Sequence, residues 1–261
     1  MLKLITKPTN GIIATCLLGI ALLGGCHNSK PTSQSTETNA GGQTSVAPPG
    51  KAVAKQNRAL VRFLNADPGE SHYDLWFDNA KTYTHVKYQR LTPYDELPAV
   101  RGEFRLRASG WDDTEPIATQ EGRLDSGKRY TVVALRDGQG HIALNVIVDN
   151  LTQPSEGKAK VRLINAAPNF GQLDVISQND RKLLFRNITV DTATGYEDVD
   201  ASTTTLVVLK KGQKKPVLLI SNLNLEAGKM YTIVMAGGTA NAPLQAIPIE
   251  DALTQSIALG L

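Results

Sequence analysis

Beyond residue 57 the chain alternates short apolar runs with turn residues, and no stretch repeats its apolar residues at the 3.6-residue period of a helix. The runs are rich in Val, Ile, Leu, Tyr and Thr, which favour strands. We therefore predict an all-β chain with strands near residues 58–65, 72–78, 84–90, 102–109, 116–121, 129–136 and 141–149, and again near 158–165, 172–177, 183–189, 203–210, 216–223, 230–236 and 243–249.

The second set of strands repeats the first. The segment VRFLNADP from Val61 recurs as VRLINAAP from Val161, and LDSGKRYTVV from Leu124 recurs as LEAGKMYTIV from Leu225. A repeat this long indicates a duplicated domain and not a solenoid. We predict repeats at 58–153 and 158–255, a linker at 154–157 and a tail at 256–261, and we expect residues 56–155 and 156–261 to fold when expressed separately.

Strand number and turn chemistry indicate the fold class. Seven short strands in about 95 residues are typical of an immunoglobulin-like antiparallel β-sandwich. Each repeat also carries Leu-x-x-Gly-x-x-Tyr, ending at Tyr130 and at Tyr231, which is the spacing of a tyrosine corner. In that motif the glycine permits a tight turn and the tyrosine hydroxyl bonds to upstream backbone. Both tyrosines are predicted to be structural.

The N-terminal segment has the order of an export signal. Lys3 and Lys7 precede an apolar run from Ile12 to Leu23, which is too short to span a bilayer. Leu-Gly-Gly then leads to Cys26, which resembles the lipobox of bacterial lipoproteins. That resemblance implies cleavage after a signal peptide of residues 1–25 and diacylation of Cys26. The alternative is an ordinary secretory signal in which Cys26 is incidental.

Lipidation would decide where the protein resides. Two or three acyl chains on Cys26 would make membrane attachment effectively permanent. An aspartate directly after the lipidated cysteine resembles an inner-membrane retention signal, but this chain has His27 there. We therefore expect delivery to the outer membrane in a Gram-negative cell. Residues 26–57 are polar and lack aromatic side chains, which predicts a flexible tether between the lipid and the folded repeats.

Cysteine content and charge exclude several functions. The only other cysteine, Cys16, lies in the signal, so the mature chain has no intramolecular disulfide and no thiol for catalysis. Loss of Lys3 and Lys7 lowers the basic count from 28 to 26, against 25 acidic residues. So balanced a chain lacks the electrostatic footprint of a nucleic-acid-binding protein.

The repeated motif carries a family resemblance. Val-Arg-x-x-Asn-Ala-x-Pro, followed by Asp74 or Asp174 between apolar residues, resembles domain of unknown function (DUF) family 4397 over residues 58–153 and 158–255. The resemblance implies an exported bacterial protein, often with tandem copies, and no assigned activity. The family pattern often has histidine where this chain has Asn65 and Asn165, so no role of that histidine transfers.

Candidate catalytic and metal-binding residues do not form a pattern. Ser71, His72 and Asp74 are the residue types of a triad, but neighbours on a strand point to opposite faces. Neither the four histidines nor the acidic residues from Asp112 to Glu115 have metal-ligand spacing. We expect no catalytic, metal-binding or cofactor-binding residue.

The two repeats differ in aromatic content, with ten aromatic residues in the first and four in the second. Trp76, Tyr83, Tyr88 and Trp111 are candidate ligand contacts, with Tyr94 beside them, for stacking on sugars or gripping a protein. The alternative is that these rings fill a larger core or the seam between the repeats.

The sequence thus favours a non-enzymatic, lipid-anchored envelope protein that acts as an interaction or structural module. The alternative is recognition of a glycan or cell-wall polymer through the aromatic residues of the first repeat. An enzyme ranks third, because no nucleophile–base pair or metal cluster is evident.

Overall fold

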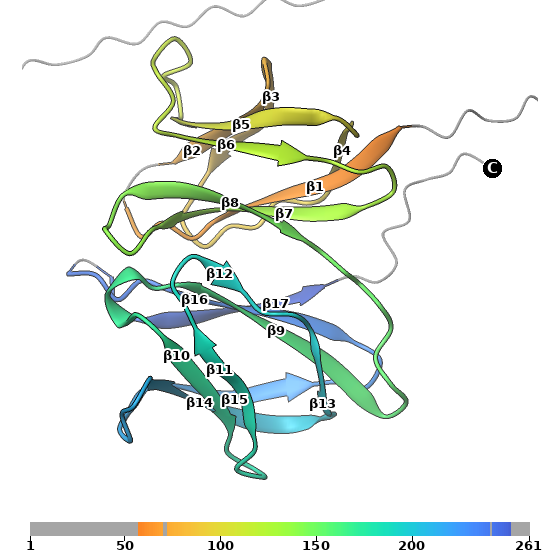
Figure 1. The fold of residues 1–261 in the computed structure, drawn as a ribbon, viewed down its shortest axis with the longest axis vertical. Coiled ribbons are helices and arrows are strands. Elements are labelled where there is room, and N and C mark those ends of the chain that lie inside the picture. The colour runs from red at the N-terminus through yellow and green to blue at the C-terminus, as the bar shows by residue number, and fades with distance from the viewer. Residues whose placement is uncertain (1–56, 70–71, 241, 252–261) are drawn as a thin grey trace, which may run out of the picture. The chain divides into compact units, whose positions relative to one another are not determined.

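The computed structural model describes residues 57–69, 72–240 and 242–251 (Figure 1). The signal peptide, Cys26, residues 26–56 of the tether and the C-terminal tail lie outside the described residues. The first repeat contains β1 (Arg58–Asn65), β2 (Tyr73–Phe77), β3 (Ala80–Val86), β4 (Asp95–Pro98), β5 (Arg101–Ala108), β6 (Ala118–Arg123), β7 (Arg129–Arg136) and β8 (Ile142–Val148).

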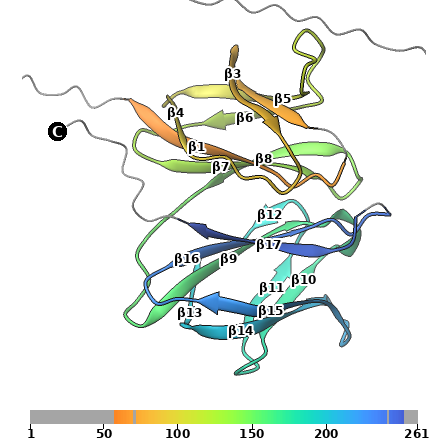
Figure 2. The same cartoon turned by 180° about the vertical axis from the view of Figure 1, so that it is seen from behind.

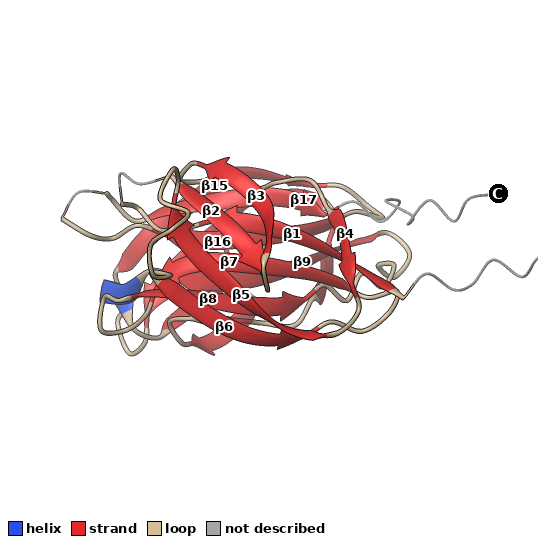
Figure 3. Cartoon of the chain, turned by 90° about the horizontal axis from the view of Figure 1, so that it is seen from above, coloured by secondary structure: helices blue, strands red, loops and turns tan. Residues whose placement is uncertain are grey.

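The second repeat follows the same plan, and its one short helix is of the 3-10 type (Figure 3). Its elements are β9 (Lys158–Ala166), η1 (Pro168–Phe170), β10 (Leu173–Ser177), β11 (Leu183–Ile188), β12 (Thr192–Ala193), β13 (Glu197–Asp200), β14 (Ser202–Lys210), β15 (Pro216–Leu225), β16 (Met230–Ala236) and β17 (Gln245–Asp251). The prediction of an all-β chain with two tandem domains is confirmed.

Each repeat is a sandwich of two sheets (Figures 1 and 2). The sheets of the first repeat have the orders β4-β1-β7-β8 and β3-β2-β5-β6. Those of the second have the orders β12-β9-β16-β17, with β13 also paired to β9, and β11-β10-β14-β15. The pairs β1–β7 and β9–β16 are parallel, and the other strand pairs are antiparallel.

The strand order differs from that of a constant-type immunoglobulin domain at the start of each repeat. An immunoglobulin domain keeps its first two strands side by side in one sheet. Here β1 and β2 belong to different sheets, because the chain crosses between the sheets after Asn65 instead of turning back in a hairpin. The sandwich itself is as predicted.

The pattern missed three short strands at sheet edges. β4 has the sequence DELP and β13 the sequence EDVD, and each pairs with the opening strand of its repeat. Four-residue strands rich in charge carry little apolar signal, and charge on an edge strand discourages pairing with other chains. The two-residue strand β12 lies on the same side of β9.

Both tyrosine corners have the hydrogen bond that their spacing predicts. Tyr130 Oη accepts the backbone N–H of Asp125 at 2.9 Å, and Tyr231 Oη accepts that of Glu226 at 3.1 Å. The turn before Tyr130 needs a left-handed residue, which Gly127 supplies with a φ of 75°.

Two apolar cores lie between the sheets of their own repeats, and a third cluster is shared between the repeats. The shared cluster contains Leu64, Ala66, Val133, Leu135, Ile164, Ala166, Val234 and Ala236. Ala66 directly follows β1, and the other residues are on β1, β7, β9 and β16, whose interiors are therefore buried on both faces. The four central strands thus pack inward in their own sandwich and outward against the other repeat.

Candidate functional site

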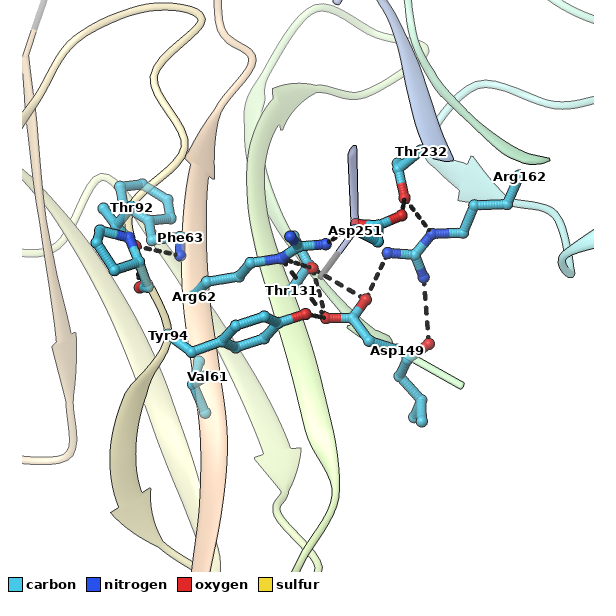
Figure 4. Close-up of polar contacts among 12 residues, drawn as sticks. Val61, Arg62, Phe63, Thr92, Tyr94, Thr131, Asp149, Arg162, Thr232 and Asp251 are labelled. Carbon is cyan, nitrogen blue, oxygen red and sulfur yellow. Dashed lines mark hydrogen bonds and ion pairs between the residues drawn. The ribbon is translucent and has the colours of Figure 1, made fainter. Parts of the chain in front are cut away.

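The arginine of the repeated motif is buried in both repeats and reaches across to the other one (Figure 4). Arg62 Nη2 lies 2.5 Å from Asp251 Oδ1, at the end of the last strand of the second repeat. Arg162 Nη2 pairs in the same way with Asp149, directly after the last strand of the first repeat. Both carboxylates are fully buried, so two ion pairs connect the repeats inside the protein.

Threonine and tyrosine side chains complete this cluster. Arg62 Nε donates to Thr131 Oγ1 at 2.8 Å, and Tyr94 Oη donates to Asp149 Oδ2 at 2.7 Å. The second repeat makes the matching bonds at 2.8 Å, from Arg162 Nε to Thr232 Oγ1 and from Tyr196 Oη to Asp251 Oδ2. We call the eight residues the seam network: Arg62, Tyr94, Thr131, Asp149, Arg162, Tyr196, Thr232 and Asp251.

The seam network holds its charges in fixed states. Burial alone would lower the pKa of the Arg62 guanidinium, but the negative charges of Asp149 and Asp251 outweigh burial and the pKa is raised. The same balance raises the pKa of Arg162. Burial also raises the pKa of Tyr94 and Tyr196, so both remain hydrogen-bond donors. Two cations face two anions, which makes the network a joint between the repeats.

The motif asparagines are structural as well. Asn65 Nδ2 donates to Val86 O at 3.0 Å, and its Oδ1 accepts the backbone N–H of Asp67 at 3.0 Å. Asn165 makes the equivalent bonds to Ile188 O and from the N–H of Ala167. Each side chain therefore fixes the end of the opening strand against the end of the third strand of the same repeat.

The motif aspartates support an unusual backbone conformation. His85 and Asn187 have φ values of 55° and 54°, in the left-handed region that residues other than glycine seldom adopt. The backbone N–H of each donates to an aspartate Oδ1 at 2.7 Å, from Asp74 for His85 and from Asp174 for Asn187. The four motif positions Arg, Asn, Pro and Asp are thus shared by both repeats, and three of them have a structural contact that explains their presence.

Two of the four candidate ligand contacts are not on an open surface, which corrects that prediction. Tyr83 is 8% exposed, and its hydroxyl donates to Val61 O inside the first sandwich. Tyr88 packs against the shared cluster, and its hydroxyl accepts a hydrogen bond from Gln245 Nε2 at 2.9 Å. Tyr83 therefore belongs to the core of the first repeat and Tyr88 to the seam between the repeats, which is the alternative that the sequence left open.

Trp76 and Trp111 remain on the outside of the first repeat. Trp76 is half-buried on β2, with Lys81 Nζ 5.3 Å and Arg107 Cζ 5.4 Å from its ring centroid. Its indole Nε1 is buried and has no hydrogen-bond partner. Trp111 lies in the loop 109–117 between β5 and β6, and its side chain is 64% exposed.

The loop that carries Trp111 is fixed by the cations that flank Trp76. Lys81 Nζ lies 2.5 Å from Asp112 Oδ1, and Arg107 Nε donates to Thr114 O at 2.8 Å. Hydrogen bonds from Asp112 and Asp74 raise the pKa of Lys81, so its ammonium stays charged. We call this region the Trp111 surface; it consists of Trp76, Lys81, Arg107, Trp111 and Asp112.

The second repeat has no counterpart of the Trp111 surface. The equivalent loop between β14 and β15 is residues 211–215, five residues against nine in 109–117. Ile176 takes the place of Trp76 on the matching strand. The seam is therefore common to both repeats, whereas the Trp111 surface belongs to the first alone.

The triad residue types do not assemble as a catalytic group. Ser71 lies outside the described residues, and the His72 ring stacks on His85 with centroids 4.2 Å apart. Asp74 instead accepts hydrogen bonds from Ser109 Oγ and Lys81 Nζ. Within residues 57–69, 72–240 and 242–251, no three His, Cys, Asp or Glu side chains are grouped to hold a metal.

No helix in the described part of the chain has the length and apolar character that crossing a membrane requires.

Comparison with known proteins gives a family and weak structural likenesses. The family model described as Domain of unknown function (DUF4397) matches residues 59–176 and 174–258. The C-terminal domain of AlgF from P. aeruginosa is 14% identical, covers 37% of this chain and 100% of its own, and has a TM-score of 0.30. A family 41 carbohydrate-binding module from streptococcal virulence factors is 10% identical over 69% of this chain and 95% of its own, with a TM-score of 0.23. At these TM-scores neither likeness carries a functional argument, and no curated protein matches the chain.

Proposed function

The chain belongs to the family described as Domain of unknown function (DUF4397), and from this premise we propose that it is a non-enzymatic interaction module of the bacterial cell envelope. In this proposal a lipid on Cys26 holds it at the membrane, at the outer membrane in a Gram-negative cell. Its partner is an envelope protein or glycan, and its contact site is the Trp111 surface.

One observation carries the proposal: Trp111 is 64% exposed although polar contacts fix its loop. The exposed part of an apolar ring does not stabilise the fold, and the second repeat forms the same sandwich with a shorter loop. Tryptophan is enriched among the residues that dominate binding energy at interfaces. Binding therefore explains an exposed indole on a fixed loop better than stability does.

Glycan or cell-wall-polymer recognition is the second candidate, and the composition of the Trp111 surface favours it. An indole offers a flat apolar face for the C–H side of a sugar ring. Asp112 follows Trp111 in the loop, and Lys81 and Arg107, which bond to that loop, add further hydrogen-bonding groups, as hydroxyl recognition requires.

Replacement of Trp111 by alanine tests the proposed site. We expect Trp111→Ala in residues 27–261 to weaken binding by at least ten-fold, since removal of a central aromatic anchor costs about 2 kcal/mol or more. A glycan array measures saccharide binding, and cross-linking to envelope proteins detects a protein partner.

Leu219→Ala is the matched control, because Leu219 is an exposed apolar residue on β15 of the second repeat. Saccharide binding lost in Trp111→Ala alone would select glycan recognition, and a cross-linked protein lost in Trp111→Ala alone would select a protein partner. Equal binding by both variants and the parent would refute the site. Hydrolase turnover that disappears on a change at Ser71 or His72 would overturn the non-enzymatic proposal.

Membrane anchoring has its own test. We expect Cys26→Ser to abolish fatty-acid labelling and to release the protein from the membrane fraction, because no other cysteine remains in the mature chain. Metabolic labelling and cell fractionation measure both effects. A parent protein that takes up no label and fractionates like the variant would contradict the lipid anchor.

A further inference from the structure

The second repeat contains a cavity of about 100 Å³ between its two sheets. Its apolar wall includes Val199, Leu206 and Leu225, and Ser177 and Thr204 add two hydroxyl-bearing side chains. Lys158 and Asp200, which form an ion pair with each other, also line it. All residues that line the cavity belong to the second repeat, whereas the Trp111 surface belongs to the first.

The first repeat fills the corresponding space with two aromatic rings. Phe77 faces Phe104 across β2 and β5, and their centroids are 4.8 Å apart. In the same register of the second repeat, Ser177 faces Leu206 across β10 and β14. In the first repeat, two packed aromatic rings therefore fill the space that is a cavity in the second repeat.

The residue beside the rings also differs between the repeats. Gly102 precedes Phe104 by two positions, and a Cβ there would lie 2.5 Å from Phe77 Cζ. The second repeat has Thr204 two positions before Leu206, so a hydroxyl stands where the first repeat requires glycine. The changes thus remove two rings and add two hydroxyl groups, those of Ser177 and Thr204.

The hydroxyl group of Thr204 has no hydrogen-bond partner. Thr204 is 6% exposed, and its Oγ1 is buried without a hydrogen bond. Buried hydroxyls are nearly always hydrogen-bonded, so this one indicates a missing donor or acceptor in the cavity. The other buried residues of the lining are Ser177, Val199, Leu206 and Leu225, so the interior of the cavity is mainly apolar. The charged lining residues are exposed or half-buried: Lys158, Asp180, Lys182, Asp198 and Asp200.

We propose that the cavity binds a short neutral acyl group, of the size of acetyl, on a larger polar molecule of the envelope. An apolar cavity of about 150 Å³ accepts benzene with its six carbons, so about 100 Å³ suits roughly four heavy atoms. The apolar wall receives the methyl group, and Thr204 Oγ1 donates to the carbonyl oxygen. A charged group is excluded because its desolvation would be uncompensated inside. The charged pair of Lys158 and Asp200 suits the polar remainder of the ligand.

The experiment compares N-acetylglucosamine with glucosamine, which lacks the acetyl group. Residues 27–261 contain every described strand and are labelled at the Leu and Val methyl groups for NMR. We expect N-acetylglucosamine at millimolar concentration to shift the methyl signals of Val199, Leu206 and Leu225. Glucosamine leaves them in place, and neither sugar moves the signals of Val133 or Val234 in the shared cluster.

Two variants test the role of the cavity itself. Thr204→Val keeps the side-chain shape and removes the hydroxyl, and we expect it to weaken binding at least ten-fold and to raise Tm. Ser177→Phe combined with Thr204→Gly restores one ring and the glycine of the first repeat, and we expect it to abolish the shifts. Thr203→Val, at an exposed neighbour on β14, is the control that leaves binding unchanged.

Several results would overturn the proposal. These are the absence of shifts at the cavity methyl groups, equal shifts with glucosamine, and parental affinity in Thr204→Val. A cavity that holds only water would give no shifts at these methyl groups. Because Trp111→Ala does not touch the cavity, loss of binding at the Trp111 surface and loss of binding here are separate outcomes.

Discussion

Replacement of Asp149 by alanine is expected to lower the free energy of unfolding by about 3–5 kcal/mol, the usual cost of removing one partner from a buried ion pair. Asp149 accepts hydrogen bonds from Arg162, Tyr94 and Thr131. Without the carboxylate, the Arg162 guanidinium stays buried and loses its counter-charge. Denaturant titration followed by circular dichroism measures the loss.

The repeated structure supplies matched controls. Asp251→Ala removes the equivalent carboxylate and should cost a similar amount, because Asp251 pairs with Arg62, Tyr196 and Thr232 in the same way. Asp125→Ala, at an exposed pair with Arg123, should change the stability little. A stability of Asp149→Ala within about 1 kcal/mol of the parent would show that the seam network does not join the repeats.

Separation of the two repeats is the second change with a large expected effect. Residues 56–155 and 156–261, produced separately and then mixed, should form a 1:1 complex. Each half exposes its part of the shared cluster and leaves a buried arginine without the carboxylate of the other repeat. Size-exclusion chromatography with light scattering measures the complex.

The seam also predicts what each half does alone. Both faces carry the same Arg, Tyr, Thr and Asp, so a single half should pair with a second copy of itself. Leu64→Asp in the first half places a charge in the shared cluster and should prevent both kinds of pairing. Folded halves that remain monomeric before and after mixing would contradict this interpretation. Independent folding of each half stays a prediction of the sequence.

Local patterns predicted most of the strands. The expected segments 58–65, 129–136 and 230–236 coincide with β1, β7 and β16, since long runs of Val, Leu, Ile and Tyr end at clear turn signals. The sheet order could not be predicted in the same way. It depends on pairings between distant segments, such as the parallel contact of β1 with β7.

The seam has a signal in the sequence. A sandwich strand with one face in water alternates apolar and polar residues, whereas VRFLNA and YTVVAL are almost continuously apolar. Such runs indicate burial on both faces, and the arginine within the first of them occurs in both repeats. Asp149 and Asp251 carried no comparable signal, because only the fold brings them to the arginine of the other repeat.

The candidate site was predicted only as a set of residue types. Aromatic content directed attention to the first repeat, but it did not separate buried Tyr83 from exposed Trp111. The direction of Tyr83 depends on a register shift in the β2–β3 pair, and the exposure of Trp111 depends on contacts of its loop with Lys81 and Arg107. The cavity depends likewise on which residue faces Ser177 across the sheet.

We infer from the seam network that the repeated motif joins the two repeats into one cooperative unit and leaves binding to the outer surface. Both tryptophans, Trp76 and Trp111, lie in the first repeat, so their fluorescence reports on that repeat alone. Circular dichroism reports on the strands of both. Denaturant unfolding of residues 27–261 is predicted to give a single transition with the same midpoint by both signals. A fluorescence transition separated from a second transition seen only by circular dichroism would contradict the claim.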